Sequence, residues 1–264
     1  MDCNDAPPKP DPDDDIFEVC PVARAFEILS LLWELDGAGP SEIAARLELP
    51  DSTAYDYLRS LNQTPFVSRE NGEYRLSSYF ITIGGKMKYR NRLYQVAKPE
   101  MKQVVSETDE LVGLTVENDG RALVYHQEEG RQALNLGTYS GATTPFHTVA
   151  TGKAILAYLP EERIDEIIDE RGLEQRTDQT ITDPATLKRE LEQIREDGYA
   201  VDWDEQVIGM GMAAVPIIID DEILGSFGIV VPTGRIRDST YREEIVQKLQ
   251  EMTNKVTINY QYGN

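Results

Sequence analysis

The sequence is poor in the residues on which most enzymes and metal sites depend. Its 264 residues include two cysteines, Cys3 and Cys20, and two histidines, His126 and His147. The cysteines lack the spacing of zinc ligands, and neither histidine lies in an HExxH arrangement or a nucleophile elbow. We therefore expect a protein that is not an enzyme, with no catalytic residues, no metal and no cofactor.

Long apolar runs are also missing. No stretch reaches the roughly 18 apolar residues that a membrane-spanning helix needs, and no signal peptide opens the chain. Hydrophobic residues make up 40% of the sequence, which is enough for packed cores in a chain of this length. We expect a soluble, cytoplasmic protein of two modest domains that has no contact with membranes.

Basic residues are few, and lysine is the scarcer kind. The chain has 47 acidic and 26 basic residues, nine of them lysine, and a net charge of −21. Self-repulsion of this size destabilises a compact protein unless salt screens it, so the composition indicates a halophile. Residues 1–18, with a net charge of −6, are predicted to form a disordered acidic tail, whereas residues 19–95 are neutral. Binding to DNA phosphates is favoured in that neutral part.

Two helical patterns meet within the neutral part, across a polar break at residues 49–52. Apolar residues recur at three- and four-residue spacing on both sides of the break. They are Ile43, Ala44 and Leu47 before it, and Tyr55, Leu58 and Leu61 after it. Ser41, or a turn at Pro40, can begin the first helix, and Asp51 or Ser52 can cap the second. Two short helices joined in this way predict a helix-turn-helix, whose second helix fits the major groove of DNA.

A hairpin is predicted directly after the two helices. Asn71-Gly72 lies between short strands at residues 66–69 and 74–76, and Asn-Gly is the strongest short signal for a hairpin. An apolar stripe predicts one more helix, over residues 22–35, ahead of the pair. Helix, helix-turn-helix and hairpin together predict a winged helix DNA-binding domain over residues 19–77.

A linker helix is predicted over residues 78–98, where Pro99 interrupts the pattern. Its apolar stripe includes Ile81, Ile83 and Met87, and this stripe can either form a seam between two copies of the chain or pack on its own domain. The stretch from residue 74 to residue 99, which includes this helix, has no acidic residue. Its basic residues are Arg75, Lys86, Lys88, Arg90, Arg92 and Lys98.

Mixed helices and strands follow, so we predict an α+β sensor domain over residues 99–264. The predicted helices cover residues 101–110, 148–159, 161–170, 184–197 and 241–259. The predicted strands cover residues 111–116, 122–127, 134–137, 213–219 and 226–231. The strands form antiparallel hairpins, which excludes a parallel Rossmann sheet.

The segment from residue 145 to residue 164 enters a helix at Gly152-Lys153. A phosphate-binding loop is excluded, because positions 147 and 154 hold neither the glycine nor the hydroxyl residue that this motif requires. Free backbone N–H groups in the first turn of the helix can bind a carboxylate. Alternatively, Thr148 or Thr151 can cap the helix, and the sequence leaves both possibilities open.

Three segments occur in a fixed order along the chain. They are SEIAARLELPDSTAYDYLRSL with YRLSSYFITIGGK, then PFHTVATGKAILAYLP, then GYAVDWDEQVIGMGMAAVPIIIDDEILGSFGIVVPTGRI. In these segments, and over residues 20–258 as a whole, the chain resembles the IclR family of transcriptional regulators. This resemblance implies a winged helix domain, a linker helix and a GAF-like effector-binding domain. It also implies a homodimer or a dimer of dimers that controls catabolic genes in response to a small metabolite.

Matched position by position, the resemblance implies an effector pocket in the sensor domain. The implied residues are His147, Ala150, Thr151, Asp202, Met210, Met212, Gly228 and Val230. Relatives that bind small keto acids can have cysteine at Met212 and serine at Gly228 and Val230. The pocket therefore has fewer hydroxyl and thiol groups here, which favours a less densely polar ligand or a polar contact through Asp202 or His147.

The recognition helix departs from the family in charge. Many members have a basic residue at the positions of Asp51 and Asp56, so phosphate attraction falls to arginines and to the basic linker. We expect Asp51 to cap the helix. The residues expected to contact DNA are Ser52, Thr53, Tyr55, Arg59, Arg46, Arg69 and Arg75.

The sequence thus predicts a transcription regulator that binds double-stranded promoter DNA and responds to a small effector, such as a sugar-derived or organic acid. The alternative is a ligand sensor that regulates a protein partner without DNA contact, because Asp51 and Asp56 oppose phosphate binding.

Overall fold

The computed structural model describes residues 21–263, so the predicted acidic tail with Cys3 and Cys20 lies outside the described residues. The chain divides into two compact units, and the boundary in the sequence lies between Arg90 and Asn91. Each unit has its own core. Within residues 21–263, none of the helices combines the length and apolar character that crossing a membrane requires.

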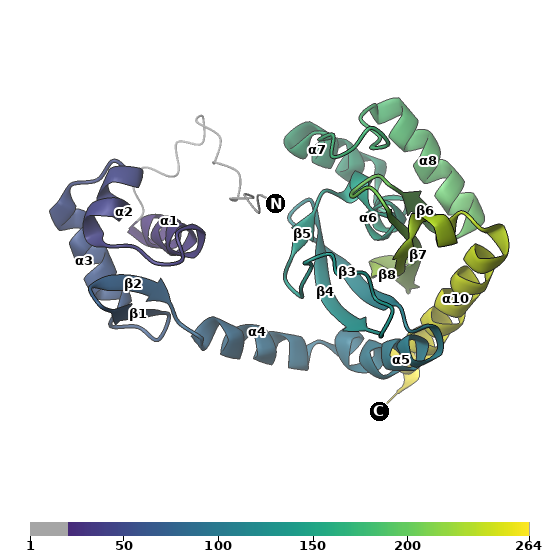
Figure 1. The fold of residues 1–264 in the computed structure, drawn as a ribbon, viewed down its shortest axis with the longest axis horizontal. Helices are drawn as coiled ribbons and strands as arrows, with labels where there is room; N and C mark the ends of the chain where they lie inside the picture. Colours follow the sequence, from purple (N-terminus) through teal and green to yellow (C-terminus); the bar gives the residue numbers. More distant parts are fainter. Residues whose placement is uncertain (1–20, 264) are drawn as a thin grey trace. The chain divides into compact units, whose positions relative to one another are not determined.

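The first unit is a small helical domain with a two-stranded hairpin (Figure 1). Its elements are α1 (Pro21–Glu34), α2 (Pro40–Arg46), α3 (Asp51–Leu61), β1 (Val67–Glu70), β2 (Glu73–Leu76) and α4 (Tyr79–Arg90). Ile28, Leu32, Ile43 and Leu58 from the first three helices form the centre of its core with Tyr74 of the hairpin. This is the predicted winged helix.

The wing turns at Asn71 and Gly72, as predicted, and both have positive φ angles of 52° and 93°. Positive φ at both central residues matches the twist of a tight antiparallel hairpin, and asparagine and glycine adopt it readily. Backbone hydrogen bonds in both directions join Tyr74 to Ala38, at 2.9 and 3.0 Å. They fix the wing to the loop between α1 and α2.

The first helix of the pair begins at Pro40, the second of the two predicted starts, and the other helix begins differently from the prediction. Gly39 is the N-cap of α2 and Pro40 its first residue, so Ser41 does not cap it. Pro50 is the N-cap of α3, with no side-chain cap, so Asp51 lies inside the first turn. A proline N-cap or N1 residue lacks the amide that would need a partner, and Asp51 still interacts favourably with the helix dipole.

The predicted linker helix is two helices, and the break lies at Asn91 rather than at Pro99. α4 ends at Arg90, and α5 (Arg92–Thr108) begins after Asn91, whose side chain accepts a hydrogen bond from the Tyr94 amide at 2.9 Å. Pro99 lies within α5. The helix continues through it because Leu93, Ala97, Met101 and Val104 bury one face of α5 in the second core. Packing here outweighs the hydrogen bond that proline removes.

The second unit is built on a six-stranded antiparallel sheet with the order β5-β4-β3-β8-β7-β6. The strands are β3 (Leu111–Asn118), β4 (Arg121–Glu129), β5 (Thr143–Thr144), β6 (Ala200–Trp203), β7 (Met210–Ile219) and β8 (Glu222–Pro232). The strand predicted at residues 134–137 is wrong, because these residues have no regular structure. β5 and β6, two and four residues long, were not predicted.

Helices cover both faces of this sheet (Figure 1). On one face α5 and α10 (Ser239–Tyr262) pack on Val112, Leu114 and Phe227. On the other, the 3-10 helix η1 (Phe146–Thr148) leads into α6 (Ala150–Leu156), with α7 (Glu161–Arg171) and α8 (Pro184–Asp197) beyond it. α9 (Thr233–Ile236) precedes α10.

All seven residues of α6 are buried. The helix contacts β3, β6, β7 and β8. Gly113, Gly228, Ala214 and Ala200 form a row of small residues across these four strands, each paired with the next. Such a row permits the close approach of a helix to a sheet.

Candidate functional site

The recognition helix α3 buries one face and exposes the other. Ala54 and Leu58 are buried in the core of the first unit. Ser52, Tyr55 and Arg59 lie on the exposed face, and Thr53 is half-buried. Three side chains able to contact bases or phosphates therefore share the outer face of a helix-turn-helix, the arrangement that direct contact with the major groove requires.

The other predicted DNA contacts lie outside α3. Arg46 is exposed at the end of α2, and Arg69 is exposed on the wing, where its guanidinium lies 5.2 Å from the ring of Tyr74. Arg75 already has two acidic partners in the same unit, Asp36 at 3.3 Å and Glu73 at 3.0 Å. Of the arginines predicted to contact DNA, Arg75 thus links the wing to the loop after α1 through ion pairs.

The eight predicted effector residues gather where α6 meets the sheet, and all are buried. Asp202 on β6 pairs with Met212 on β7, which pairs with Val230 on β8. A Cβ atom added to Gly228 would lie 2.5 Å from Thr151 Cγ2 and 3.1 Å from Met212 Sδ. These two side chains thus fill the space above Gly228.

The start of α6 is held by a side chain from a distant strand. The backbone N–H of Ala150 donates a hydrogen bond to Oδ2 of Asp202, and the helix has no cap from a nearby side chain. Thr148 instead donates its hydroxyl proton to the Pro145 carbonyl, at 2.9 Å. The sequence predicted that either an external anion or a threonine side chain would accept the free N–H groups at the start of this helix. At Ala150 the acceptor is instead the carboxylate of Asp202.

A charged cluster that the sequence did not reveal surrounds this contact. Lys153, fully buried on α6, donates hydrogen bonds to Glu190 on α8 and to both carboxylate oxygens of Glu205, at 2.7 and 2.9 Å. Burial raises the pKa of Asp202 to about 7 and that of Glu205 to about 7, against the opposing attraction of Lys153. The lone lysine within an apolar helix was the one available sequence signal.

Burial by itself would lower the pKa of Lys153, but the three carboxylates, Glu205 foremost, raise it. Lys153 therefore stays protonated. Asp202 Oδ1 has no hydrogen-bond partner within residues 21–263 and is buried. Lys153 is one cation facing three acids, Asp202, Glu190 and Glu205. Full ionisation of all three buried or half-buried carboxylates therefore costs free energy.

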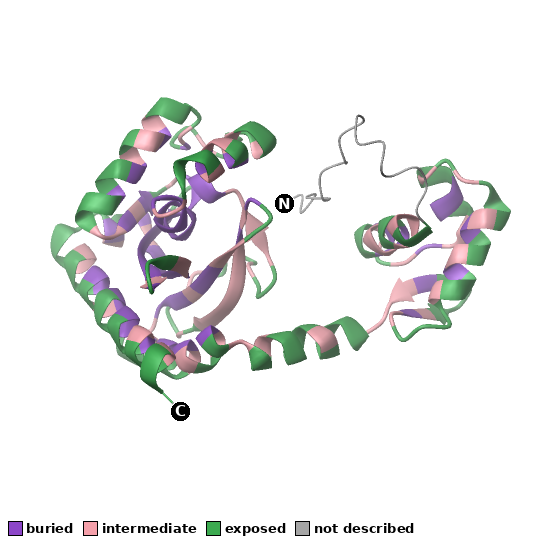
Figure 2. Cartoon of the chain, turned by 180° about the vertical axis from the view of Figure 1, so that it is seen from behind, coloured by how far each residue is buried: buried purple, intermediate pink, exposed green. Residues whose placement is uncertain are grey.

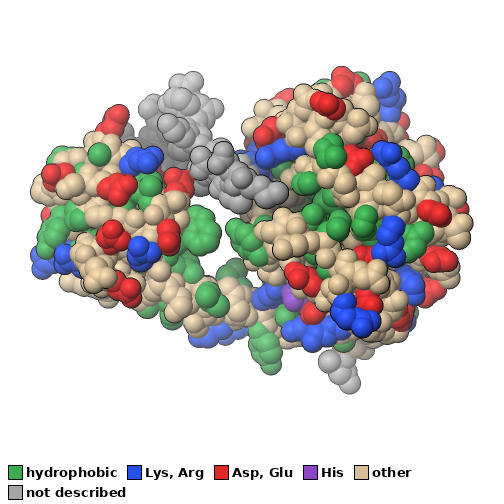
Figure 3. Space-filling model, viewed as in Figure 1, with side chains coloured by type: hydrophobic (Ala, Val, Ile, Leu, Met, Phe, Trp, Pro, Cys, Tyr) green, Lys and Arg blue, Asp and Glu red, His purple; other side chains and the backbone are tan. Residues whose placement is uncertain are grey.

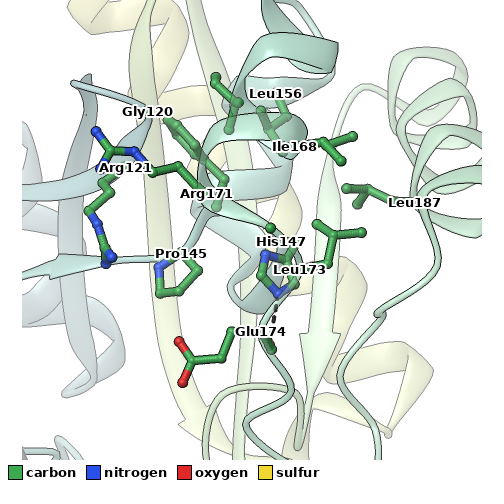
Figure 4. Close-up of a pocket in the computed structure, with 13 residues that line it drawn as sticks. Gly120, Arg121, Pro145, His147, Leu156, Ile168, Arg171, Leu173, Glu174 and Leu187 are labelled. Atoms are coloured by element: carbon green, nitrogen blue, oxygen red, sulfur yellow. Dashed lines mark hydrogen bonds between the residues drawn. The ribbon is translucent and has the colours of Figure 1, made fainter. Parts of the chain in front are cut away.

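A cleft opens beside η1 (Figure 4). His147 lines it, together with Arg121 from β4, Arg171 from the end of α7 and Glu174 from the following loop. The His147 ring bonds through Nε2 to the Glu174 carbonyl at 3.0 Å, and burial lowers its pKa. Because a carbonyl only accepts, Nε2 carries the proton and Nδ1 is an acceptor. Of the eight predicted effector residues, only His147 lines this cleft.

A winged helix joined to an α+β domain defines the class: a DNA-binding regulator with a ligand-sensing domain. Two family models match the chain, "IclR helix-turn-helix domain" over residues 21–71 and "Bacterial transcriptional regulator IclR C-terminal" over residues 87–258. The chain belongs to the IclR family of transcriptional regulators.

Its relatives include regulators from an archaeon and from a bacterium. "Probable HTH-type transcriptional regulator ArcR" of Halobacterium salinarum is 26% identical over 90% of this chain and 92% of its own length. "HTH-type transcriptional repressor AllR" of Escherichia coli K12 is 30% identical over 83% of each chain. The solved IclR regulator of Alicyclobacillus acidocaldarius is 27% identical, covers 94% of this chain and 100% of its own, and has a TM-score of 0.77.

These matches confirm the predicted class. The chain is a transcription regulator with a helix-turn-helix and a C-terminal effector-binding domain, and its relatives are regulators rather than enzymes.

Proposed function

We propose that this regulator binds its operator as a dimer, contacts the major groove through α3, and controls catabolic genes in the cytoplasm in response to a small organic acid. The observation that supports it most is the outer face of α3, which presents Ser52, Tyr55 and Arg59 while Ala54 and Leu58 anchor the opposite face.

Two exposed apolar surfaces of the first unit support the dimer. On α1, Val22, Phe26 and Trp33 are spaced along one stripe and are 61%, 64% and 68% exposed. α4 has no buried residue, although Ile81 and Met87 are apolar (Figure 2). Soluble proteins rarely leave such surfaces uncovered.

The occupant we propose is a second copy of this chain. A two-fold dimer places two recognition helices one turn of DNA apart, which matches the form of an operator with two half-sites. α4 also contains Lys86 and Lys88 but no acidic residue, and green and blue side chains follow one another along it in Figure 3. A dimer built there brings basic side chains close to the DNA backbone.

The effector residues proposed from the family resemblance are His147, Ala150, Thr151, Asp202, Met210, Met212, Gly228 and Val230. Since all are buried and Ala150 already bonds to Asp202, a ligand enters among them only by displacing Met212 or α6. Methionine is flexible enough to permit the first of these.

Operator binding tests the proposal. The purified regulator should bind its own upstream region more tightly than random DNA of equal length at matched salt. Arg59→Ala should lose most of that preference and keep the circular dichroism spectrum. Arg163, which is half-buried and paired with Glu166 in the second unit, supplies a control away from the DNA-binding unit as Arg163→Ala. Equal affinity of the unaltered protein for both DNAs would refute the proposal.

A further inference from the structure

The cleft beside η1 contains a buried donor that the protein itself does not satisfy. Arg171 lines the cleft, and its Nε–H is buried without an acceptor within residues 21–263. The Nη2 atom of the same guanidinium holds the β3–β4 turn, through the Asp119 carbonyl and carboxylate at 2.6 Å each. Arg171 is therefore held in place while its buried Nε–H lacks an acceptor among the described residues, and a ligand reaches this donor when the lining of the cleft yields around it.

Two acids near this donor already have partners. Asp119 is bonded to Arg171, and the Glu174 carboxylate is paired with Arg176 at 3.0 Å. Arg121 lies along the same wall of the cleft as Arg171 (Figure 4). The Arg171 guanidinium on this wall, with an Nε–H that the described part of the chain leaves unsatisfied, favours an anion.

The rest of the cleft is apolar and small. Leu156, Ile168, Leu173 and Leu187 line it opposite the arginines. Its volume is about 410 Å³ including the part open to solvent. A small molecule with one carboxylate and a short hydrocarbon body matches this size and this apolar wall.

We propose that this cleft binds a small aliphatic monocarboxylate, with one carboxylate oxygen accepting the Arg171 Nε–H. The inference rests on the proposed function and deepens it, because it moves the anion from the start of α6, where Asp202 already bonds to Ala150, to the cleft beside η1. His147 also lines this cleft and its Nδ1 is an acceptor, so an acid with a hydroxyl that reaches Nδ1 gains a further contact.

The cleft is connected to the rest of the domain through η1. His147 lies in η1, and η1 leads through Val149 directly into α6 and the Ala150–Asp202 contact. An acid that binds the cleft more tightly in one arrangement of η1 than in another shifts α6 toward that arrangement.

Sodium propionate is the probe, with propionamide as its neutral match, at constant ionic strength and with chloride varied in a separate arm. Thermal shift and calorimetric titration should detect propionate on the unaltered protein and weaker or no binding of propionamide. Arg171→Lys retains a cation for Asp119 but removes the Nε–H donor, and Leu173→Trp fills the cleft. Each should weaken propionate binding about tenfold or more, the scale of one charge-assisted hydrogen bond.

One control variant should leave propionate binding unchanged. Arg163→Lys alters an arginine of the same helix that pairs with Glu117 near the same β-turn. Met212→Leu is not a control, because Met212 belongs to the proposed effector residues; it tests whether the acid enters among them instead of in the cleft. Operator binding without ligand is measured on every variant, so that loss of DNA binding is distinguished from loss of the acid site.

Four results overturn the inference: no propionate binding, equal binding of propionamide, binding unchanged in both cleft variants, or a chloride response that accounts for the whole effect. Loss through Met212→Leu alone would instead place the acid at the buried cluster. None of these results bears on operator recognition, which fails only if the unaltered protein does not prefer its own upstream DNA.

Discussion

Asp202 and Ala150 lie 52 residues apart in the chain, yet the carboxylate of one accepts the backbone N–H of the other at the start of α6. This contact ties the edge strand β6 to the central helix of the sensor domain. The carboxylate is 1% exposed, and the cost of burying it appears in its raised pKa.

Stability should therefore depend on pH near neutrality. Asp202 and Glu205 have pKa values of about 7 in the folded protein and ordinary values of about 4 when unfolded. Between these values the folded protein binds protons that the unfolded chain has released, so the free energy of unfolding falls as pH rises from about 4 to about 7. Asp202→Asn should flatten this decline and exceed the unaltered protein in melting temperature above pH 7.

Asp204→Asn is the control with the opposite sign. Hydrogen bonds from Thr233 and the Gly209 amide lower the pKa of Asp204, so this group stabilises the fold above its ordinary pKa and loses that effect as pH falls. Melting curves at constant potassium chloride compare the two. Identical pH profiles for Asp202→Asn and the unaltered protein would contradict the assignment.

Removal of the buried cation should be severe. Lys153→Met leaves Glu190 and Glu205 without their partner, and breaking a buried ion pair costs about 3–5 kcal/mol. Lys188→Met removes a more exposed lysine that pairs with Asp165 on the surface, and should cost less than about 1 kcal/mol. Urea unfolding measures both. The double variant Lys153→Met with Glu205→Gln should recover part of the loss, and its failure to do so would argue against a charge effect.

The space above Gly228 should not accept even a methyl group. Gly228→Ala places a Cβ atom 2.5 Å from Thr151 Cγ2, so we expect a loss of about 1–3 kcal/mol. Thr151→Ser removes that methyl and should restore most of the stability. Gly113, its partner on β3, is the matched control, since a Cβ there meets nothing within 4 Å. Chemical denaturation measures the free energy of unfolding of Gly228→Ala and Gly113→Ala. Equal losses in the two variants would disprove close packing at Gly228.

The dimer should depend on the exposed stripe of α1. Phe26→Glu places a charge in a surface that we propose lies between two copies, so light scattering should show monomer at concentrations where the unaltered protein is dimeric. Operator affinity should fall with it. Ile258→Glu, at a similarly exposed position on α10, should change neither quantity. A dimer that persists in Phe26→Glu would place the contact elsewhere.

Local signals predicted local structure well. Asn71-Gly72 specified the wing because the turn conformation is a property of those two residues. The apolar spacing of Ile43, Leu58 and their neighbours specified the helix pair for the same reason. The family resemblance, confirmed by the two family models, supplied the order of domains.

Contacts between distant segments were beyond the sequence. Nothing near Ala150 indicates that a residue from β6 takes its amide, and nothing near Lys153 indicates Glu190 and Glu205. Pro99 was expected to end a helix because propensity is local, whereas the buried face of α5 is decided by packing. The Arg171 donor likewise appears only when α7 lies against the β3–β4 turn.

The row from Gly113 through Gly228 and Ala214 to Ala200 leaves α6 in close contact with four strands and buried on every side. The packing is uneven along the row, because a Cβ atom at Gly228 would lie 2.5 Å from Thr151 whereas one at Gly113 would meet nothing within 4 Å. Movement of α6 is therefore opposed over β8 and has room over β3. We expect the helix to tilt about its contact with β8 rather than to slide along the sheet.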